Sequence, residues 1–226
     1  LMSPRKRVVC RAFGDRVRVH VVGAFGQGQP AGLKTLGGWK SFCEGFGSLP
    51  APVQVSWLAF DHSYAEQACP AALPLVFADR PQRLLDVGGN TGRWAVQCAK
   101  HDSAVHVTIA DLPPQLEFAR ATIKQHGLEA RVDCFAVDLL DEAQALPAGY
   151  DAIWMSQFLD CFSEQEIVTI LRRAASAMAA ETTLHILELF WDRQPNETAA
   201  FCLQPTSIYL TCIANGNSQI YTPSNL

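Results

Sequence analysis

Short apolar runs alternate with amphipathic segments along the chain from residue 83 onward. The apolar runs are typical of buried strands, and the segments between them repeat apolar side chains at helical spacing. Strands that alternate with helices form βαβ units, whose parallel sheet is covered by helices on both faces. In chain order, the predicted strands are "RLLDVG", "VHVTIAD", "RVDCFAVD", "YDAIWMS" and "TLHILELF".

The helices predicted in this part of the chain have recognisable ends. "RWAVQCAKH" follows the first strand, and "PPQLEFARATIKQHG" begins with prolines and ends at Gly127. Ser163 and Glu166 form an S-x-x-E capping box for "EQEIVTILRRAASAMAA". After the last strand, "NETAAFCLQPTSIYLTCIA" predicts a helix bent by Pro205.

The first part of the chain has a different pattern. "RVVCRAF" and "RVRVHVV" alternate like the two strands of a hairpin around "GD", and a glycine-rich stretch follows. "WKSFCEGFGSLP" and "PVQVSWLAFDHSYAEQACPAALPLVFAD" then predict helices, the second broken near Pro70 and Pro74. We therefore predict two parts: residues 1–80, with a partial hairpin, linker and helices, and residues 81–226, with the α/β domain.

Composition narrows the class of protein. The chain is 49% hydrophobic and 18% charged, which favours a packed core over disorder. Its apolar runs are too short to cross a bilayer, and no signal-peptide pattern is present. The eight cysteines are scattered without a C-x-x-C pair or a histidine at zinc spacing, which is typical of reduced thiols in a cytoplasmic protein and predicts no metal. Basic residues gather near the start, and the acidic remainder argues against a nucleic-acid partner.

Residues 84–92, "LLDVGGNTG", place a glycine-rich loop directly after the first predicted strand. A dinucleotide pattern started at Gly88 requires glycine where the chain has Asn90 and Arg93, and no G-K-[ST] follows to make a P-loop. A shorter spacing, from Gly88 to Gly92, lets the backbone turn sharply and lets the next helix approach the strand. Asn90 tolerates a left-handed conformation, so a ligand-binding loop is feasible.

Acidic residues end the first three predicted strands. Asp86 precedes the glycine loop. Asp111 ends the second strand about 20 residues further along the sequence, where such folds place a carboxylate that accepts hydrogen bonds from a ribose. Asp138 ends the third strand, where its carboxylate can accept a hydrogen bond from the amino group of an adenine while Leu139 packs against the ring. A lone aspartate at a strand end is usually a turn former. Three of them in register with a glycine loop indicate an adenosine ligand.

The segments "LLDVGGNTG", "IADLP", "AVDLL" and "DAIWMSQFLDCFSEQE" together resemble the successive motifs of class I S-adenosylmethionine-dependent methyltransferases. More narrowly, they are similar to O-methyltransferases of the plant caffeate and hydroxyindole type and their bacterial relatives, over about residues 30–226. The resemblance implies a Rossmann-like, doubly wound, mainly parallel sheet with S-adenosylmethionine as cofactor and S-adenosylhomocysteine as product. It assigns the cofactor to Asp86, Gly88, Gly89, Asn90, Gly92, Asp111, Leu112, Asp138, Leu139 and Ser156.

The catalytic base is where the chain departs from the family. Plant-type enzymes use a histidine shortly before the capping box, and the matching residue here is Asp160. An aspartate near its usual pKa of about 3.9 is a poor base for a phenol, unless burial or another carboxylate raises that pKa. Glu188 matches an acidic position that supports the base in the family. His62 is the substitute base, and a purely structural role for Asp160 before a helix stays open.

The two ends of the chain also differ from the family. Only the first hairpin matches its N-terminal dimerisation domain, and "YTPSNL" predicts the start of a helix that leads to an antiparallel hairpin. That hairpin completes a seven-stranded sheet in the family, whereas five strands are recognisable here and the C-terminal hairpin is missing.

The function that the resemblance implies is methyl transfer to a hydroxyl of a small, aromatic acceptor. We expect a cytoplasmic homodimer that contacts neither nucleic acid nor membrane. The alternative is a catalytically inactive, cofactor-binding relative that acts as a regulatory or assembly partner, which Asp160 in place of histidine favours.

Overall fold

The computed structural model describes residues 24, 26 and 29–225, apart from the side chains of residues 60 and 63–67. The hairpin predicted near the start of the chain lies outside the described residues.

Two compact units make up the described chain. One contains residues 65–158 and 165–187 and is called the sheet unit here. The other, called the helical unit, contains the described residues up to 64 together with 159–164 and 188–225. The domain boundary predicted between residues 80 and 81 stays a prediction.

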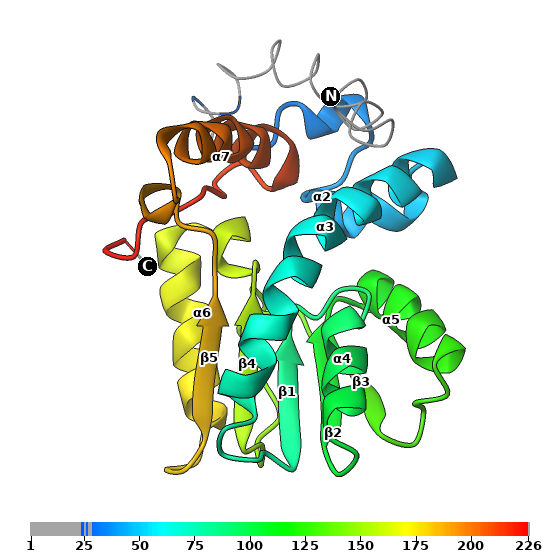
Figure 1. The fold of residues 1–226 in the computed structure, drawn as a ribbon. Helices are drawn as coiled ribbons and strands as arrows, with labels where there is room; N and C mark the ends of the chain where they lie inside the picture. The colour runs from blue at the N-terminus through cyan, green and yellow to red at the C-terminus, as the bar shows by residue number, and fades with distance from the viewer. Residues whose placement is uncertain (1–23, 25, 27–28, 226) are drawn as a thin grey trace. The chain divides into compact units, whose positions relative to one another are not determined.

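The sheet unit is built on five parallel strands in the order β3-β2-β1-β4-β5, with helices packed beside them (Figure 1). This confirms the predicted α/β class and the five-stranded parallel sheet. The strands are β1 (Arg83–Val87), β2 (His106–Asp111), β3 (Val132–Ala136), β4 (Ala152–Ser156) and β5 (Thr183–Leu187). The helices that follow them are α4 (Arg93–His101), α5 (Pro113–Gln125) and α6 (Glu164–Ala177).

The core of the sheet unit packs α4 and α5 against the two central strands. Leu84 of β1 and Ile109 of β2 are completely buried, as is Leu116 of α5. Trp94 of α4 stacks on Trp154 of β4 with ring centroids 4.3 Å apart. Burial of such side chains stabilises the sheet by roughly 1.5–3 kcal/mol each, which fixes the strands that carry the loops described below.

The register of the strands brings their carboxyl ends to one edge of the sheet. Val87 at the end of β1 is paired with Ala110 of β2 and Met155 of β4, and Ser156 is paired with Leu187. Residues that follow these strands therefore emerge at the same edge, where parallel sheets bind ligands.

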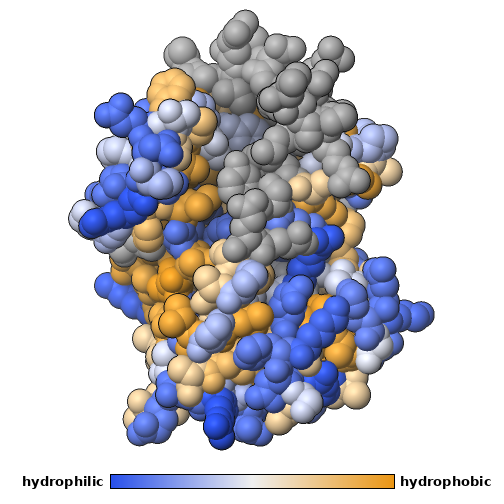
Figure 2. Space-filling view, in the orientation of Figure 1, coloured by the Kyte–Doolittle hydropathy of each residue, from blue (hydrophilic) through white to orange (hydrophobic). Residues whose placement is uncertain are grey.

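Strand β5 lies at one edge of the sheet within the described residues. Ile186 on this strand is 39% exposed, and Leu75 near the end of α3 (Ala51–Val76) is 71% exposed. Figure 2 shows hydrophobic surface in this region of the sheet unit. Residues 188–225 add no further strand, so this apolar edge has no paired strand within the described chain.

The helical unit consists of short helices around the first part of α3 and around α7 (Glu197–Tyr209). The side chain of Asn196 caps α7 by accepting a hydrogen bond of 2.9 Å from the Ala199 N–H group. The shorter elements are η1 (Leu33–Thr35), α2 (Phe42–Gly45), η2 (Phe46–Ser48), η3 (Leu159–Cys161), η4 (Trp191–Arg193) and the π-helical η5 (Leu210–Ala214). None of the helices described is both long and apolar enough to span a membrane.

Two helix predictions were wrong. Helix α3 continues through Pro70 and Pro74 instead of breaking there. Both prolines are exposed and four residues apart, so the carbonyl groups that lose their N–H partners lie on the solvent side of the helix. "WKSFCEGFGSLP" forms only the four-residue α2 and the turn η2, because its glycines and Pro50 leave no room for a longer helix.

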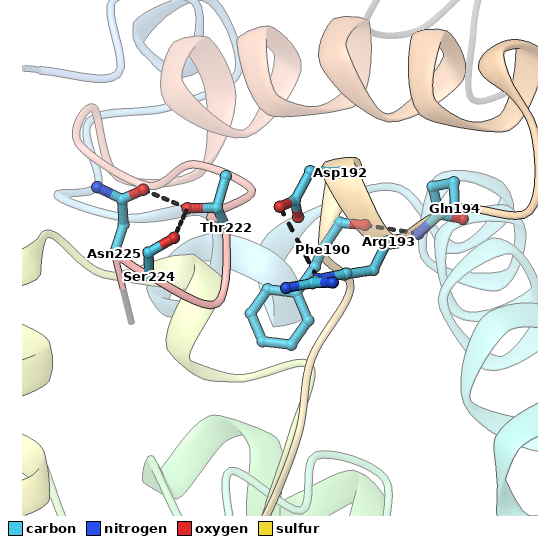
Figure 3. Close-up of polar contacts among 7 residues, drawn as sticks. All are labelled: Phe190, Asp192, Arg193, Gln194, Thr222, Ser224 and Asn225. Atoms are coloured by element: carbon cyan, nitrogen blue, oxygen red, sulfur yellow. Dashed lines mark hydrogen bonds and ion pairs between the residues drawn. The ribbon is translucent and has the colours of Figure 1, made fainter.

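The predicted helix start at "YTPSNL" is a turn in the described residues. The Thr222 side chain bonds to Asn225 and lies 3.5 Å from the Ser224 hydroxyl, as Figure 3 shows. The same figure shows η4, where Gln194 Nε2 donates to the Phe190 carbonyl at 2.7 Å.

Candidate functional site

The loop after β1 has the backbone conformation that its glycines allow. Gly88 and Gly92 have φ angles of 72° and 75°, and Asn90 has a φ of 50°. The Gly88 N–H group donates to the Ala110 carbonyl at 2.9 Å, which keeps the start of the loop tied to β2. The loop ends at Gly92, the N-cap of α4. Left-handed conformations are costly for most residues, so the glycines and Asn90 are required here by the backbone.

Each loop glycine is also packed against a neighbour of the sheet unit. A Cβ atom on Gly88 would lie 2.2 Å from the Phe158 ring, and one on Gly92 would lie 2.9 Å from Ile109. At Gly89, a Cβ atom would lie 2.5 Å from Oδ2 of Asp86. The three glycine positions therefore have no room for a side chain, and each presents only its main chain.

Asp111 at the end of β2 is bonded to the glycine loop. Its Oδ2 atom accepts a hydrogen bond of 2.8 Å from the Asn90 N–H group, and its Oδ1 atom accepts one of 2.7 Å from Leu112. Burial raises the pKa of Asp111 to about 6, although both hydrogen bonds favour the ionised form. Each carboxylate oxygen can accept two hydrogen bonds, and each oxygen of Asp111 accepts one from these N–H groups, so one position on each oxygen remains for a ligand hydroxyl.

Asp86 lies beneath the same loop and is 2% exposed. Burial, together with the charge of Asp111, raises the pKa of Asp86 to about 8. Oδ2 of Asp86 has no hydrogen-bond partner among the described residues. The loop thus packs against the buried Asp86 at Gly89, and its Asn90 N–H group is hydrogen-bonded to Asp111.

The third predicted acidic position differs from expectation in its local structure. Strand β3 ends at Ala136, two residues before Asp138, instead of at Asp138 itself. The Asp138 side chain accepts a hydrogen bond of 2.9 Å from the Leu140 N–H group, which is the turn-forming role of an aspartate in a loop. Leu139 beside it is buried.

Ser156 is the last residue of β4, and two residues after it were missed by the sequence reasoning. Gln157 has a φ of 49° and donates its N–H group to the Leu187 carbonyl at 2.8 Å. Phe158 then packs its ring against Gly88. No sequence pattern marks a left-handed glutamine. The aromatic residue two positions after β4 was the available signal.

The helical unit places Asp160 in the short helix η3, where it is 9% exposed. The Cys161 thiol donates to Oδ1 of Asp160 at 3.5 Å. Burial raises the pKa of Asp160 to about 6, and the charge of Asp61 acts in the same direction. A carboxyl group with such a pKa is ionised near neutral pH and is a stronger base than an exposed aspartate.

Glu188 supports the start of η3. Its Oε1 atom accepts a hydrogen bond of 2.8 Å from the Leu159 N–H group. From the other side, the main chain of Gln219 donates to the Asp160 carbonyl at 3.0 Å, and the Tyr221 hydroxyl donates to the Phe162 carbonyl at 2.7 Å. Asn215 donates its side-chain amide to the Cys161 carbonyl. Asp160 is therefore held on a well-bonded stretch of backbone.

The second predicted base, His62, follows Asp61 on α3 and is half-buried. In addition to burial, the charge of Asp61, the neighbour of His62 in the sequence, raises the pKa of Asp160. Sequence reasoning missed Asp61, because nothing in its local spacing indicates that α3 and η3 interact.

Aromatic rings of the helical unit lie beside this acidic group. Trp57 packs on Phe42 and on Tyr209, with centroid distances of 4.8 Å and 5.6 Å. Burial raises the pKa of Tyr209 well above its usual range, and the charge of Asp61 contributes to the shift. Asp61 thus interacts electrostatically with both Tyr209 and Asp160.

In the described part of the chain, no three His, Cys, Asp or Glu side chains are grouped as metal ligands. None of the seven described cysteines forms a disulfide.

Comparisons with known proteins agree with this fold. Residues 71–222 match the family model of the O-methyltransferase domain. A 3-hydroxy-5-methyl-1-naphthoate 3-O-methyltransferase from Streptomyces sahachiroi is 31% identical over 111 residues, which cover 49% of this chain and 32% of that protein. A mitomycin biosynthesis 6-O-methyltransferase from Streptomyces lavendulae is 28% identical over 119 residues, which cover 52% of this chain and 33% of that protein.

Among solved structures, the apo form of the S-adenosylmethionine-dependent methyltransferase SibL superposes with a TM-score of 0.70 at 26% sequence identity. The match covers 96% of this chain and 62% of that one. The aligned stretches span about a third of the length of the curated relatives.

Proposed function

The chain belongs to the O-methyltransferase domain family, and we propose that it transfers a methyl group from S-adenosylmethionine to a hydroxyl of a small aromatic acceptor. The observation that carries this proposal is the glycine loop bonded to Asp111, at the sheet edge where such folds bind adenosine ligands. The cofactor supplies a methyl group on a positively charged sulfur.

The residues of the sheet unit fit the cofactor. The main chain at Gly88, Gly89 and Gly92 would face a ligand without a side chain of its own, and a Cβ atom at any of these three glycines would meet a neighbour within 3 Å. Asp111, next to Leu112, has one free position on each oxygen for the ribose hydroxyls. Asp138 and Leu139 would hold the adenine, and the main chain of Ser156 would lie along the cofactor.

Asp160 is the proposed base, with Glu188 as the residue that positions it. The buried carboxylate accepts the proton of the acceptor hydroxyl, and a pKa of about 6 leaves it ionised at neutral pH. The pKa of a simple phenol, near 10, is about four units above that of Asp160, so proton transfer to Asp160 is unfavourable. The best acceptors are therefore hydroxyl groups that conjugation to a carbonyl or quinone has made more acidic. His62 is the competing candidate for the base.

The acceptor class is supported by the relatives and by the aromatic side chains. The two relatives are named for methylation of a naphthoate hydroxyl and for a step of mitomycin biosynthesis. Phe42, Trp57 and Tyr209 give this chain rings that can pack on a planar acceptor.

Incubation with methyl-labelled S-adenosylmethionine and a panel of hydroxynaphthoates, hydroxyquinones, catechols and simple phenols tests the proposal. We expect a labelled methyl ether, formed fastest from the more acidic hydroxyls. Cofactor binding without any labelled product would favour the inactive, regulatory alternative. A product labelled on carbon would show that the acceptor atom was wrongly assigned.

The assembly we propose is a cytoplasmic homodimer. Its support is the exposed apolar surface of the helical unit, where Val55, Phe201 and Ile208 are 60%, 67% and 40% exposed. Twofold dimers are the commonest assembly of soluble proteins. A monomer mass from light scattering at tens of micromolar protein would contradict it.

A further inference from the structure

The charge of Asp86 is a feature that the proposed methyl transfer does not explain. The side chain lies near the end of the central strand β1 and is 2% exposed. Its Oδ2 atom has no hydrogen-bond partner among the described residues, and the main chain of Gly89 passes directly over it. A carboxylate in this place is shielded from bulk solvent and has no hydrogen bond from the described residues at that oxygen to stabilise its negative charge.

The titratable groups that interact electrostatically with Asp86 come from three neighbouring elements. They are Asp111 on β2, Cys98 on α4 and Cys69 on α3. Burial raises the pKa of both thiols, so they stay neutral. Asp111 is the remaining group, and its charge has the same sign as that of an ionised Asp86.

Hydrogen bonding decides which of the two carboxyl groups keeps a proton. Asp111 accepts N–H groups from Asn90 and Leu112, which favour its ionised form. Asp86 lacks such a bond at Oδ2. Two buried carboxyl groups in electrostatic contact do not both ionise easily, so the proton stays on Asp86. The pKa of about 8 for Asp86, against about 6 for Asp111, agrees with this order.

We propose that cofactor binding expels a proton that Asp86 holds in the free protein, an inference that rests on the proposed cofactor site. The family resemblance places the methionine part of the cofactor at the loop around Gly88, so the ammonium group of that part would lie near the carboxyl group, and its positive charge would favour the ionised form of Asp86. The proton passes to the solvent. Affinity therefore rises with pH while free Asp86 is protonated, by up to tenfold per pH unit, and levels off above about pH 8.

Titration calorimetry with S-adenosylhomocysteine tests the inference. Binding enthalpies measured at about pH 7 in two buffers with different ionisation enthalpies give the number of protons released. The wild type should release about 0.5–1 proton more than Asp86→Asn, which mimics the protonated group and has nothing to release. The amino group of the ligand titrates in the same range, and the comparison with the variant cancels its contribution.

Asp133→Asn is the matched control, because it removes an exposed carboxylate from the neighbouring strand β3. It should release as many protons as the wild type. If Asp86→Asn does not fold, Asp86→Ala serves the same comparison. Equal proton release by the wild type and the Asp86 variant would overturn the inference while leaving the cofactor site intact. No binding of S-adenosylhomocysteine by the wild type would overturn the proposed function itself, and the inference with it.

Discussion

Asp111 in the sheet unit and Asp160 in the helical unit both have a pKa raised by burial to about 6, but different neighbours hold them. Asp111 accepts two backbone N–H groups, one of them from the glycine loop. Asp160 interacts with a thiol and with a second carboxylate, Asp61. Hydrogen bonds from N–H groups stabilise a fixed negative charge, whereas a like charge nearby favours proton uptake. The first environment suits a ligand-binding carboxylate, and the second suits a base.

The largest expected effect comes from changing Asp160, the proposed base. Asp160→Asn keeps the shape of the side chain and removes its basicity, so turnover should fall by about 10²–10⁴-fold. In the wild type, kcat should rise as pH increases through about 6, because the ionised form is the active one. Steady-state rates with the best acceptor measure both. His62→Gln is the control, and loss of turnover in that variant with an active Asp160→Asn would transfer the role to His62.

A smaller effect is expected from changing Asp111, the proposed ligand-binding carboxylate. Asp111→Ala removes a charged acceptor for ribose hydroxyls, which should weaken S-adenosylhomocysteine binding by about 1.5–3 kcal/mol, or roughly 10–150-fold. Calorimetric titration measures the affinity. Asp133→Ala removes an exposed carboxylate of β3 and should bind normally. Unchanged affinity in Asp111→Ala would exclude this residue from the cofactor site.

The positioning role of Glu188 predicts a difference between two substitutions. Glu188→Gln keeps an oxygen that can accept the Leu159 N–H group, so kcat should fall less than about tenfold. Glu188→Ala leaves that N–H group without its acceptor and should lower kcat further, with the affinity for the cofactor unchanged. Equal rates for both variants would show that the hydrogen bond to η3 does not matter for turnover.

The smallest effect concerns stability. Asp86 has a folded pKa of about 8, above its unfolded value, so the folded state binds more protons and loses stability as pH rises from about 4 to 8. Asp86→Asn should remove this loss and raise Tm by several degrees at about pH 8, and by less at about pH 5. Thermal unfolding followed by circular dichroism measures it. A Tm gain that is the same at both pH values would contradict the assigned proton.

The sheet unit could be predicted in detail because its information is local. Gly88 and Asp111 lie within one βαβ unit, and the strands β1 and β2 that carry them are neighbours in the sheet, so both residues could be singled out from the sequence. Their part in cofactor binding stays a prediction. The length of β3 was misjudged by two residues at Asp138, where a turn-forming side chain bonds to its own loop. Phe158 was missed because its contact with Gly88 joins distant parts of the chain.

The helical unit was harder to predict for the same physical reason. Asp160 was proposed as the base from its position relative to the family motif, a role that stays a prediction, and Asp61 interacts with it from a different helix. The backbone of η3 is held by residues 188, 215, 219 and 221, which no local pattern connects. Helix α3 also continues through two prolines, since their lost hydrogen bonds lie on the exposed side.

The separation of binding from proton removal is tested most directly by titrating S-adenosylhomocysteine into four proteins. These are the wild type, Asp111→Ala, Asp160→Asn and the double variant. The account predicts that Asp160→Asn binds within about twofold of the wild type and that the double variant binds like Asp111→Ala, because independent sites contribute additively. A loss of affinity of about tenfold or more in Asp160→Asn alone would contradict it, because Asp160 would then belong to the cofactor site.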